Sequence, residues 1–395
     1  MSKILSVNAG SSSLKFQLLE MPAETVITKG LVERIGFEDA VFNISFEDQK
    51  IEKVLPILDH EVAVNLLLES LLELNIVASY EEINGVGHRV VHGGEKFATS
   101  VVVTDEVLAE IESLSELAPL HNPANALGIK AFAKALPHAV SVAVFDTAFH
   151  QTMEKDAYLY PVSSAWYEKH GVRKYGFHGT SHLYVSQRAI ELLDMPAEET
   201  KIITVHIGNG GSLAAVKGGK SVDTSMGFTP LAGIMMGTRS GDIDPAILPF
   251  IMEKENMTID AAVNALNKQS GLAGVSGLSS DMRDILGAVE KGDEAATMAF
   301  NLFLKRICDY IGSYFVYLGG ADAIVFTAGI GENSYETRQA ICDRLSGLGI
   351  VLDNEANACR GVEALVSAPE SKVKVFAIPT NEELVIARDT LEFLK

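Results

Sequence analysis

The sequence predicts an α/β protein in which mixed β-sheets are flanked by helices and in which two halves of the chain follow one design. The first observation is a pair of similar segments, residues 4–20 and 202–216, each of which reads as strand, donor-rich turn and strand. The second is the alternation of short apolar runs with helical patterns along the rest of the chain. The third is size, because 395 residues with 47% hydrophobic content can fill two cores.

The first segment is an apolar strand, a Gly/Ser-rich turn and a second strand in which Leu14, Phe16 and Leu18 alternate with polar residues. The turn exposes backbone N–H groups and the three hydroxyls of residues 11–13, and Lys15 follows directly. Concentrated donors with one cation are what a polyphosphate needs. The residues alone leave open an ordinary serine-rich surface turn.

The second segment has the same design. Glycines at 208, 210 and 211 permit positive φ angles and close approach of the backbone to a ligand, and Gly218-Gly219 forms a tight turn into a further strand. Two such hairpins nearly half a chain apart indicate duplicated domains that face one cleft.

The other elements follow from periodicity and from start and stop signals. Asn122 is expected to cap the helix that starts at Pro123, Asp146 ends a buried strand, and a Gly-x-Gly turn follows the strand at 323–327. Helices are predicted at 58–74, 105–117, from 123, at 293–318, from 334 and from 381, and strands at 83–91, 140–145, 323–327 and 372–378.

Composition excludes several classes of function. Lys and Arg total 32 against 52 Asp and Glu, and the formal charge of −20 argues against nucleic acid or an anionic membrane as a partner. The cysteines, Cys308, Cys342 and Cys359, lack metal-ligand spacing and fit a reduced compartment. No signal peptide or membrane span is visible, so the expected location is the cytoplasm.

Arginines in glycine-rich loops are the main candidates for binding an anion. Arg89 lies in His-Arg-Val-Val-His-Gly-Gly, Arg239 in Met-Gly-Thr-Arg-Ser-Gly-Asp and Arg283 in Ser-Asp-Met-Arg-Asp. Each could also be an ordinary surface residue, but arginine is preferred where an anion is bound in a planar, bidentate way. His178 and His182 have the spacing of a zinc pair, but the glutamate of the HExxH pattern is absent.

Familiar nucleotide motifs are missing. The glycine-rich passage after residue 327 lacks the third glycine of a Rossmann fingerprint, and neither a Walker A loop nor a Gly-x-Ser-x-Gly elbow occurs. Donor-rich hairpins for a nucleotide, together with arginines and a histidine for a small anion, favour phosphoryl transfer.

At this level of detail the chain resembles the acetate kinase (acetokinase) family along its whole length. The motifs that carry the resemblance include Asn-Ala-Gly-Ser-Ser-Ser-Leu-Lys-Phe, Gly-His-Arg-Val-Val-His-Gly-Gly, Phe-Asp-Thr-Ala-Phe-His, Tyr-Gly-Phe-His-Gly-Thr-Ser-His, His-Ile-Gly-Asn-Gly-Gly-Ser and Phe-Thr-Ala-Gly-Ile-Gly-Glu-Asn. The family belongs to the sugar kinase/heat-shock/actin superfamily. The resemblance implies two duplicated RNase H-like domains, here residues 1–149 joined by the terminal helix 383–395, and residues 150–382.

The resemblance also implies an activity, namely reversible transfer of a phosphoryl group between ATP and acetate, giving acetyl phosphate and ADP, with Mg²⁺ or, in its place, Mn²⁺. Asp146 would be the essential carboxylate, and Arg239 with His178 would stabilise the transferring group. The remaining roles implied are metal binding by Asn8 and Glu382, phosphate contact by Lys15, substrate carboxylate binding by Arg89, and an apolar acetate pocket of Val91, Leu120, Phe177 and Pro230.

The resemblance places the ATP site on three glycine-rich or charged stretches. Residue 282 is often phenylalanine in the family, and Met282 can still pack along an adenine face. The nucleotide-binding residues implied are His206, Ile207, Gly208, Asn209, Gly210, Asp281, Met282, Arg283, Gly329, Ile330, Gly331, Glu332 and Asn333.

Two alternatives remain at this stage. A propionate or butyrate kinase would use the same chemistry with a roomier pocket, and a non-catalytic actin-like ATP switch would share the fold. The family resemblance further implies a homodimer.

Overall fold

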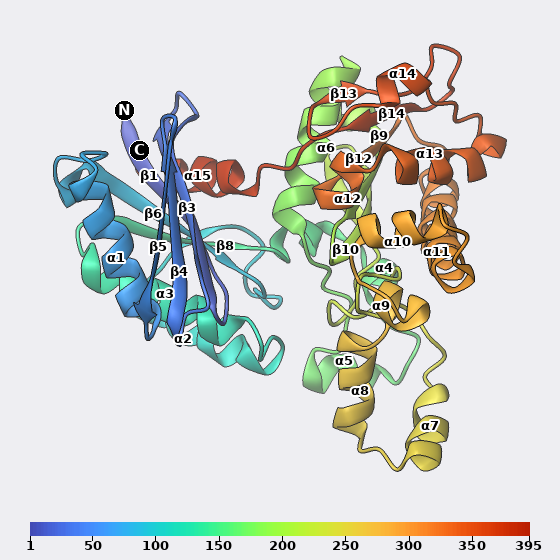
Figure 1. Ribbon diagram of the computed structural model, residues 1–395, viewed down its shortest axis with the longest axis horizontal. Helices are drawn as coiled ribbons and strands as arrows, with labels where there is room; N and C mark the ends of the chain where they lie inside the picture. The colour runs from blue at the N-terminus through green and yellow to red at the C-terminus, as the bar shows by residue number, and fades with distance from the viewer. The chain divides into compact units, whose positions relative to one another are not determined.

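The computed structural model describes all 395 residues, Met1 to Lys395, which form two compact units (Figure 1). Unit 1 comprises Met1–Phe149 together with Asn381–Lys395, and unit 2 comprises His150–Thr380. The chain therefore leaves unit 1 once, builds unit 2, and returns with its last helix. Each unit contains one mixed β-sheet flanked by helices.

The sheet of unit 1 has eight strands in the order β5-β4-β3-β2-β1-β6-β8-β7. The first five strands form an antiparallel meander, β6 and β8 continue the sheet in parallel with β1, and β7 closes it as an antiparallel edge. The strands are β1 (Ser2–Ala9), β2 (Ser13–Met21), β3 (Thr25–Glu33), β4 (Phe37–Phe46), β5 (Gln49–Ile57), β6 (Ile83–Val90), β7 (Val101–Val102) and β8 (Val140–Phe145).

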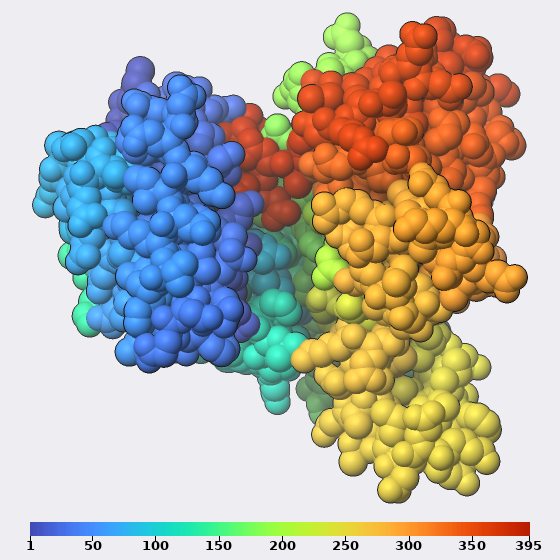
Figure 2. Space-filling model, in the orientation of Figure 1, coloured from blue at the N-terminus to red at the C-terminus, as the bar shows by residue number.

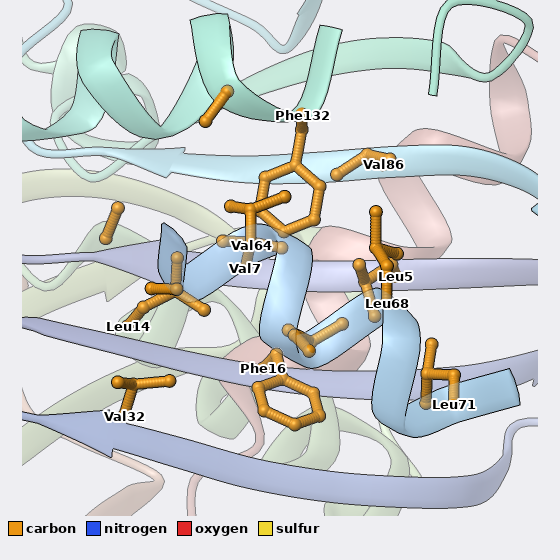
Figure 3. Close-up of a cluster of buried hydrophobic side chains, with 14 of the residues drawn as sticks. Leu5, Val7, Leu14, Phe16, Val32, Val64, Leu68, Leu71, Val86 and Phe132 are labelled. Atoms are coloured by element: carbon orange, nitrogen blue, oxygen red, sulfur yellow. The ribbon is translucent and has the colours of Figure 1, made fainter. Parts of the chain in front are cut away.

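Helices α1 (His60–Glu73) and α3 (Asn122–Ala135) cover one face of this sheet. Figure 3 shows Val64, Leu68 and Leu71 of α1 packed over the strands. Phe132 of α3 enters the same core. The alternate apolar residues of β1 and β2 form the sheet side of this core. Burying such side chains contributes about 1.5–3 kcal/mol each, so this face fixes the register of the hairpin. Helix α2 (Asp105–Ser113) packs beside α3.

The opposite face of the sheet carries α15 (Glu382–Glu392), whose Ile386 packs on Val142 and Val144. The helix approaches closely because the strand beneath it has glycines. A Cβ at Gly87 would lie 2.4 Å from Ile386 Cγ2 and 2.4 Å from Thr390 Oγ1. The last element of the chain is thus an integral part of unit 1.

The sheet of unit 2 repeats the order of the inner part of unit 1. Its order is β11-β10-β9-β12-β14-β13, with β9, β10 and β11 antiparallel, β12 and β14 parallel to β9, and β13 an antiparallel edge. The strands are β9 (Lys201–Ile207), β10 (Gly211–Lys217), β11 (Lys220–Thr224), β12 (Ala323–Thr327), β13 (Ala364–Leu365) and β14 (Lys374–Ala377). This matches β3-β2-β1-β6-β8-β7 strand for strand, so the predicted α/β fold with duplicated halves is confirmed.

Unit 2 carries most of the helices. The longest, α11, begins after the cap Asp293 and ends at Gly319, as the sequence predicts. Figure 2 shows α7 and α8 (yellow) projecting from the rest of unit 2. The helices are α4 (Lys155–Tyr158), α5 (Ser164–His170), α6 (Gly179–Leu193), α7 (Ile247–Glu255), α8 (Ile259–Lys268), α9 (Gly271–Ser276), α10 (Met282–Val289), α11 (Glu294–Leu318), α12 (Ala328–Asn333), α13 (Tyr335–Arg344) and α14 (Asn354–Asn357).

Two local predictions are wrong. Helix α3 begins at Asn122 itself, and the Asn122 side chain does not cap it, because its Oδ1 accepts from His92 N–H at 3.1 Å and its Nδ2 donates to the His92 carbonyl at 3.0 Å. The passage after β12 is a short helix, α12, and not a turn, with Ala328 at φ +64° allowing the chain to change direction.

None of the helices combines the length and the apolar character needed to cross a lipid bilayer.

Candidate active site

In unit 1 the predicted polar residues gather where three neighbouring strands end. Asn8 is the penultimate residue of β1, Arg89 the penultimate residue of β6, and Asp146 follows β8 directly. These strands are parallel and adjacent, so their carboxyl ends meet at one edge of the sheet, where ligands of α/β proteins bind. We call Asn8, Lys15, Arg89, Asp146 and Glu382 the Arg89 cluster.

The centre of this cluster is an ion pair between Arg89 and Asp146. Arg89 Nε donates to Asp146 Oδ1 at 2.9 Å and Nη2 donates to Oδ2, which makes a bidentate contact. Arg89 Nη1 also donates to Asn8 Oδ1 at 3.3 Å. Burial alone would lower the pKa of Arg89, but the charges of Asp146 and Glu382 and the hydrogen bonds to Asp146 outweigh burial and raise it.

Two further members come from β2 and α15. Lys15 stands directly opposite Asn8 in the β1–β2 register, and its Nζ forms an ion pair with Glu383. The side chain of Asn381 caps α15 by accepting from Leu384 N–H, so Glu382 lies in the first turn, with Oε2 3.8 Å from Arg89 Nε. The returning helix therefore adds carboxylates to the edge of the sheet.

The donor set of the Arg89 cluster fits a hard divalent cation. It offers an amide oxygen from Asn8 and carboxylate oxygens from Asp146 and Glu382, all of which approach the same guanidinium. Mg²⁺ takes one or two protein carboxylates and completes its shell with water and phosphate oxygens. No group of three or more His, Cys, Asp and Glu side chains in the chain is arranged to hold a metal by itself.

In unit 2 the β9–β10 turn lies beside the start of α6. His178 precedes the first residue of α6 and adopts φ +56°, a strained value for a residue with a Cβ. Its Nδ1 lies 2.9 Å from Ser212 Oγ on β10, and its ring stacks on His206 at 4.1 Å between centroids. We call His178, His206, Gly210, Ser212 and Arg239 the His178 cluster.

Arg239 approaches the same turn from the long loop between β11 and α7. A Cβ at Gly210 would lie 3.5 Å from Arg239 Nη1 and 3.7 Å from His178 Nε2, so the guanidinium and the imidazole both border this glycine. Arg239 forms no ion pair, and its Nη1 reaches only the Pro230 carbonyl, at 3.4 Å, and Met236 Sδ. Burial lowers its pKa, so this guanidinium is desolvated without a compensating anion.

A cavity of about 770 Å³ opens beside the turn within unit 2. This volume suits a nucleotide-sized ligand. Eight of the predicted nucleotide-binding residues line it, namely Gly208, Asn209, Asp281, Met282, Arg283, Gly329, Ile330 and Asn333. Met282 is almost fully buried in the wall, whereas the side chain of Arg283 is 87% exposed at the rim.

Other residues predicted for this site have different surroundings. His206 lies in β9 under the turn, where its Nδ1 meets Ser181 Oγ at 2.8 Å, and Ile207 is fully buried in the core. Gly331 packs α12 against the sheet, because a Cβ there would lie 3.3 Å from Ile207 Cγ1. Glu332 Oε1 accepts from Ala328 N–H at 2.8 Å and Thr380 N–H at 2.9 Å, which ties α12 to the end of the sheet.

The charged pair at the cavity rim is local. Asp281 caps α10 by accepting from the backbone N–H of Arg283, and the Arg283 side chain folds back onto the same carboxylate. That side-chain hydrogen bond is the main reason why the pKa of Asp281 falls to about 2. The carboxylate therefore stays ionised, and the guanidinium can turn from it to an incoming anion.

The sequence reasoning missed several residues of the cavity and its support. Arg338, fully buried in α13, donates from Nη1 to the Gly331 carbonyl at 2.8 Å and to the Glu332 carbonyl at 3.1 Å, and so fixes the end of α12. Its position four residues into a helical segment, with no charge pattern around it, gave no signal. The other lining residues missed are Ser280, Leu286, Gly287, Glu290, Ser334, Glu336 and Arg360.

The four apolar residues predicted for acetate divide between the units. Val91, which follows β6, and Leu120 belong to unit 1, whereas Phe177 and Pro230 belong to unit 2. Val91 and Phe177 are buried, and Leu120 is 71% exposed, unusual for a leucine.

Comparison with known proteins gives one consistent result. Residues 3–388 match the model of the acetokinase family. Acetate kinase of Anoxybacillus flavithermus is 59% identical over 391 residues, covering 99% of this chain and 98% of the relative, and that of Bacillus velezensis is 60% identical over 391 residues, covering 99% of each chain.

Solved structures agree with the sequence relatives. The crystal structure of Porphyromonas gingivalis acetate kinase superposes with a TM-score of 0.96 at 48% identity and covers 100% of both chains. That of a propionate kinase from Francisella tularensis gives 0.93 at 41% identity and covers 99% of this chain and 100% of the other.

Proposed function

This chain belongs to the acetokinase family, and we propose that it catalyses the reversible transfer of the γ-phosphoryl group of ATP to acetate, giving acetyl phosphate and ADP. The observation that carries the proposal is the half-buried guanidinium of Arg239, which lacks an anion and borders the same glycine as His178. The nucleotide-sized cavity beside that turn supports ATP as the donor.

In the proposed reaction Arg239 and His178 bind the phosphoryl group during transfer. That group is planar and spreads its negative charge over three oxygens, so fixed cations and N–H donors lower the barrier more than they stabilise the substrate. Backbone N–H groups of the β9–β10 turn contribute donors, and Arg283 contributes a mobile cation at the rim of the cavity.

The Arg89 cluster supplies the acceptor side of the proposal. Arg89 would bind the acetate carboxylate and Lys15 the nucleotide phosphates, while Val91, Leu120, Phe177 and Pro230 would contact the methyl group. Asn8, Asp146 and Glu382 would hold Mg²⁺, or Mn²⁺ in its place. The metal would neutralise phosphate charge. Asp146 also orients Arg89 through its two hydrogen bonds.

Acyl hydroxamate formation tests the function directly. Purified protein with MgATP, acetate and hydroxylamine is expected to yield acetohydroxamate, because hydroxylamine traps an acyl phosphate as it forms. Hydrolysis of ATP with no trapped product would contradict the proposal and would favour the actin-like ATP switch. An Arg239→Ala preparation serves as the control for contaminating kinase.

Propionate is the second candidate acceptor, and the similarity to a propionate kinase of known structure favours testing it. One methylene in an apolar pocket changes specificity by about 10–200-fold. We expect kcat/KM to be higher for acetate than for propionate or butyrate. A preference for propionate in matched assays would reassign the substrate and leave the phosphoryl chemistry intact.

We further propose a homodimer located in the cytoplasm, on the basis of the family resemblance. Light scattering at several protein concentrations tests the first point, since a monomer mass throughout would contradict it.

A further inference from the structure

Hydroxyl and imidazole groups continue inward from His178 as an unbroken chain. Ser212 Oγ lies 2.9 Å from His178 Nδ1 and 2.7 Å from His182 Nε2, and His182 Nδ1 lies 2.7 Å from Thr204 Oγ1. All three residues are fully buried, Ser212 on β10, His182 on α6 and Thr204 on β9. Water therefore cannot replace any of these partners. Which atom donates in one hydrogen bond therefore determines which atom donates in the neighbouring bond.

His182 is neutral in this setting. Burial, with the charges of His150 and His206, holds the pKa of His182 well below its ordinary range. A neutral imidazole carries one N–H, so one ring nitrogen of His182 donates and the other accepts.

This restriction leaves two arrangements of protons. In the first, His182 Nδ1 donates to Thr204, whose own hydroxyl can turn to the Ala214 carbonyl at 3.4 Å. Ser212 then donates to His182 Nε2 and its oxygen accepts from His178 Nδ1. In the second, every donor is reversed, and Ser212 donates to His178 Nδ1.

The two arrangements differ in what His178 can do. Only in the first does His178 have an acceptor for an Nδ1–H group, so only there can both ring nitrogens carry protons. In the second, Nδ1 is occupied as an acceptor and His178 stays neutral.

The surroundings make this difference important. Within unit 2, the stacked ring of His206, the guanidinium of Arg239 across Gly210, and His182 through Ser212 face His178. The Arg239 cation opposes a second proton on His178, and an anion at Nε2 favours one.

We propose that Ser212, His182 and Thr204 are positioning residues that hold the His178 ring and support its doubly protonated form when a phosphoryl group lies at Nε2. This role rests on the proposed function, since that function supplies the anion. The relay would switch from the second arrangement to the first as the anion arrives, without movement of any heavy atom.

Thr204→Val tests the relay from its far end, three hydrogen bonds away from His178. Valine keeps the shape of threonine but can neither accept from His182 Nδ1 nor donate to it. The first arrangement would then leave a buried N–H without an acceptor, which costs more than the unpaired ring nitrogen of the second, so His182 is expected to keep its proton on Nε2. We expect the His178 titration, followed by ¹⁵N signals assigned with a His178→Gln variant, to move to lower pH by about one unit. The value of kcat near neutral pH should fall about tenfold, with KM for ATP and acetate within about twofold.

Thr224→Val is the matched control. Thr224 is also fully buried in the same sheet, but its hydroxyl donates to the Leu213 carbonyl at 2.9 Å and lies outside the relay. We expect it to leave the His178 titration and the pH profile of kcat unchanged.

Equal shifts in both valine variants, or no shift in either, would refute the relay. A wild-type protein that makes no acyl phosphate but still shows the shift only in Thr204→Val would refute the proposed reaction and retain the relay.

Discussion

At the scale of single residues, burial desolvates both Arg89 and Arg239, but the two arginines differ in their partners. Arg89 has its charge matched by Asp146 and Glu382, which raise its pKa. Arg239 has lost water without gaining an anion, and its pKa falls. An arginine kept in that state interacts more strongly with an anion that arrives later, because little solvent must be displaced.

Replacing Arg239 with alanine should therefore affect the chemical step. We expect kcat to fall by at least about 10²-fold while the affinity for ATP changes little, since the proposed role of the guanidinium is to act on the transferring group. Steady-state kinetics combined with calorimetric titration of ATP separates the two quantities. Losses of equal size in ATP binding and kcat would count against this role.

Arg283→Ala is the contrasting variant. The Arg283 side chain is 87% exposed at the rim of the nucleotide cavity, and its hydrogen bonds go only to Asp281. We expect a higher KM for ATP with kcat nearly unchanged, the reverse of the pattern for Arg239.

For single residues, the sequence indicates which side chains are candidates for chemistry better than it indicates which partners they contact. It singles out Arg89, Arg239 and His178, because arginine and histidine in glycine-rich loops are informative residue types. It does not reveal that Glu332 accepts backbone N–H groups, or that a buried Arg338 supports α12, because both depend on partners distant in sequence.

At the scale of helices and strands, the main feature is the close packing of a helix on a sheet. Helix α15 rests on β6 at Gly87, where a Cβ would lie 2.4 Å from two side-chain atoms of the helix. The same helix carries Glu382 to the Arg89 cluster. Its fit on the sheet therefore affects both stability and the geometry of the site.

Gly87→Ala should destabilise unit 1. The added methyl group must displace Ile386 or Thr390, and overpacking of this kind costs about 1–3 kcal/mol of unfolding free energy. Urea denaturation followed by circular dichroism measures the loss. Unchanged stability would mean that α15 is not held against β6.

Gly312→Ala in the middle of α11 provides a control of opposite sign. Nothing lies within 4 Å of a Cβ at this position. Alanine in a helix interior is favoured over glycine by about 0.5–1 kcal/mol, so this variant should be slightly more stable.

Helices and strands that carry their own capping residues or a continuous apolar run are predicted well. Those that depend on contacts with distant parts of the chain are not. The sequence locates α11 and β12 to within a residue, because the caps Asp293 and Gly319 and a continuous apolar run mark them. It mistakes Asn122 for a cap, since the His92 backbone that takes this side chain is 30 residues away. The edge strands β7 and β13 have two residues each and leave no pattern to detect.

Both units of the whole molecule bury neutral histidines. Burial lowers the pKa of His88 to about 3, that of His92 to about 4 and that of His150 to about 4, from an ordinary value of 6.5. His88 and His92 belong to unit 1 and His150 to unit 2. At a pH between these lowered values and 6.5, the three histidines bind protons in the unfolded chain but stay neutral in the folded chain.

Stability should therefore fall as pH decreases below about 6.5. Above that value neither state binds these protons, and below it each such histidine costs about 1.4 kcal/mol of unfolding free energy per pH unit until its folded pKa is reached. Urea midpoints measured at intervals from pH 7.5 to pH 4.5 should show this decline. His88→Leu should flatten the slope, whereas substitution of the exposed His170 by Gln should not.

A constant midpoint across this range would contradict the burial of these rings as neutral groups.

The duplicated architecture is the part of the whole molecule that the sequence predicts most directly. Two hairpins of one design lead to two sheets with the same strand order, since each hairpin seeds the same succession of strands. The extension of only one sheet by β4 and β5 follows from contacts that no local pattern encodes.

The return of α15 to unit 1 also bears on how the protein is made. A ribosome releases the strands of unit 1 early but synthesises the helix that covers Gly85 and Gly87 only after all of unit 2. Until then, that face of the nascent sheet has no covering helix and the Arg89 cluster lacks Glu382. Translation therefore completes the packing of unit 1 and the Arg89 cluster in the same final step.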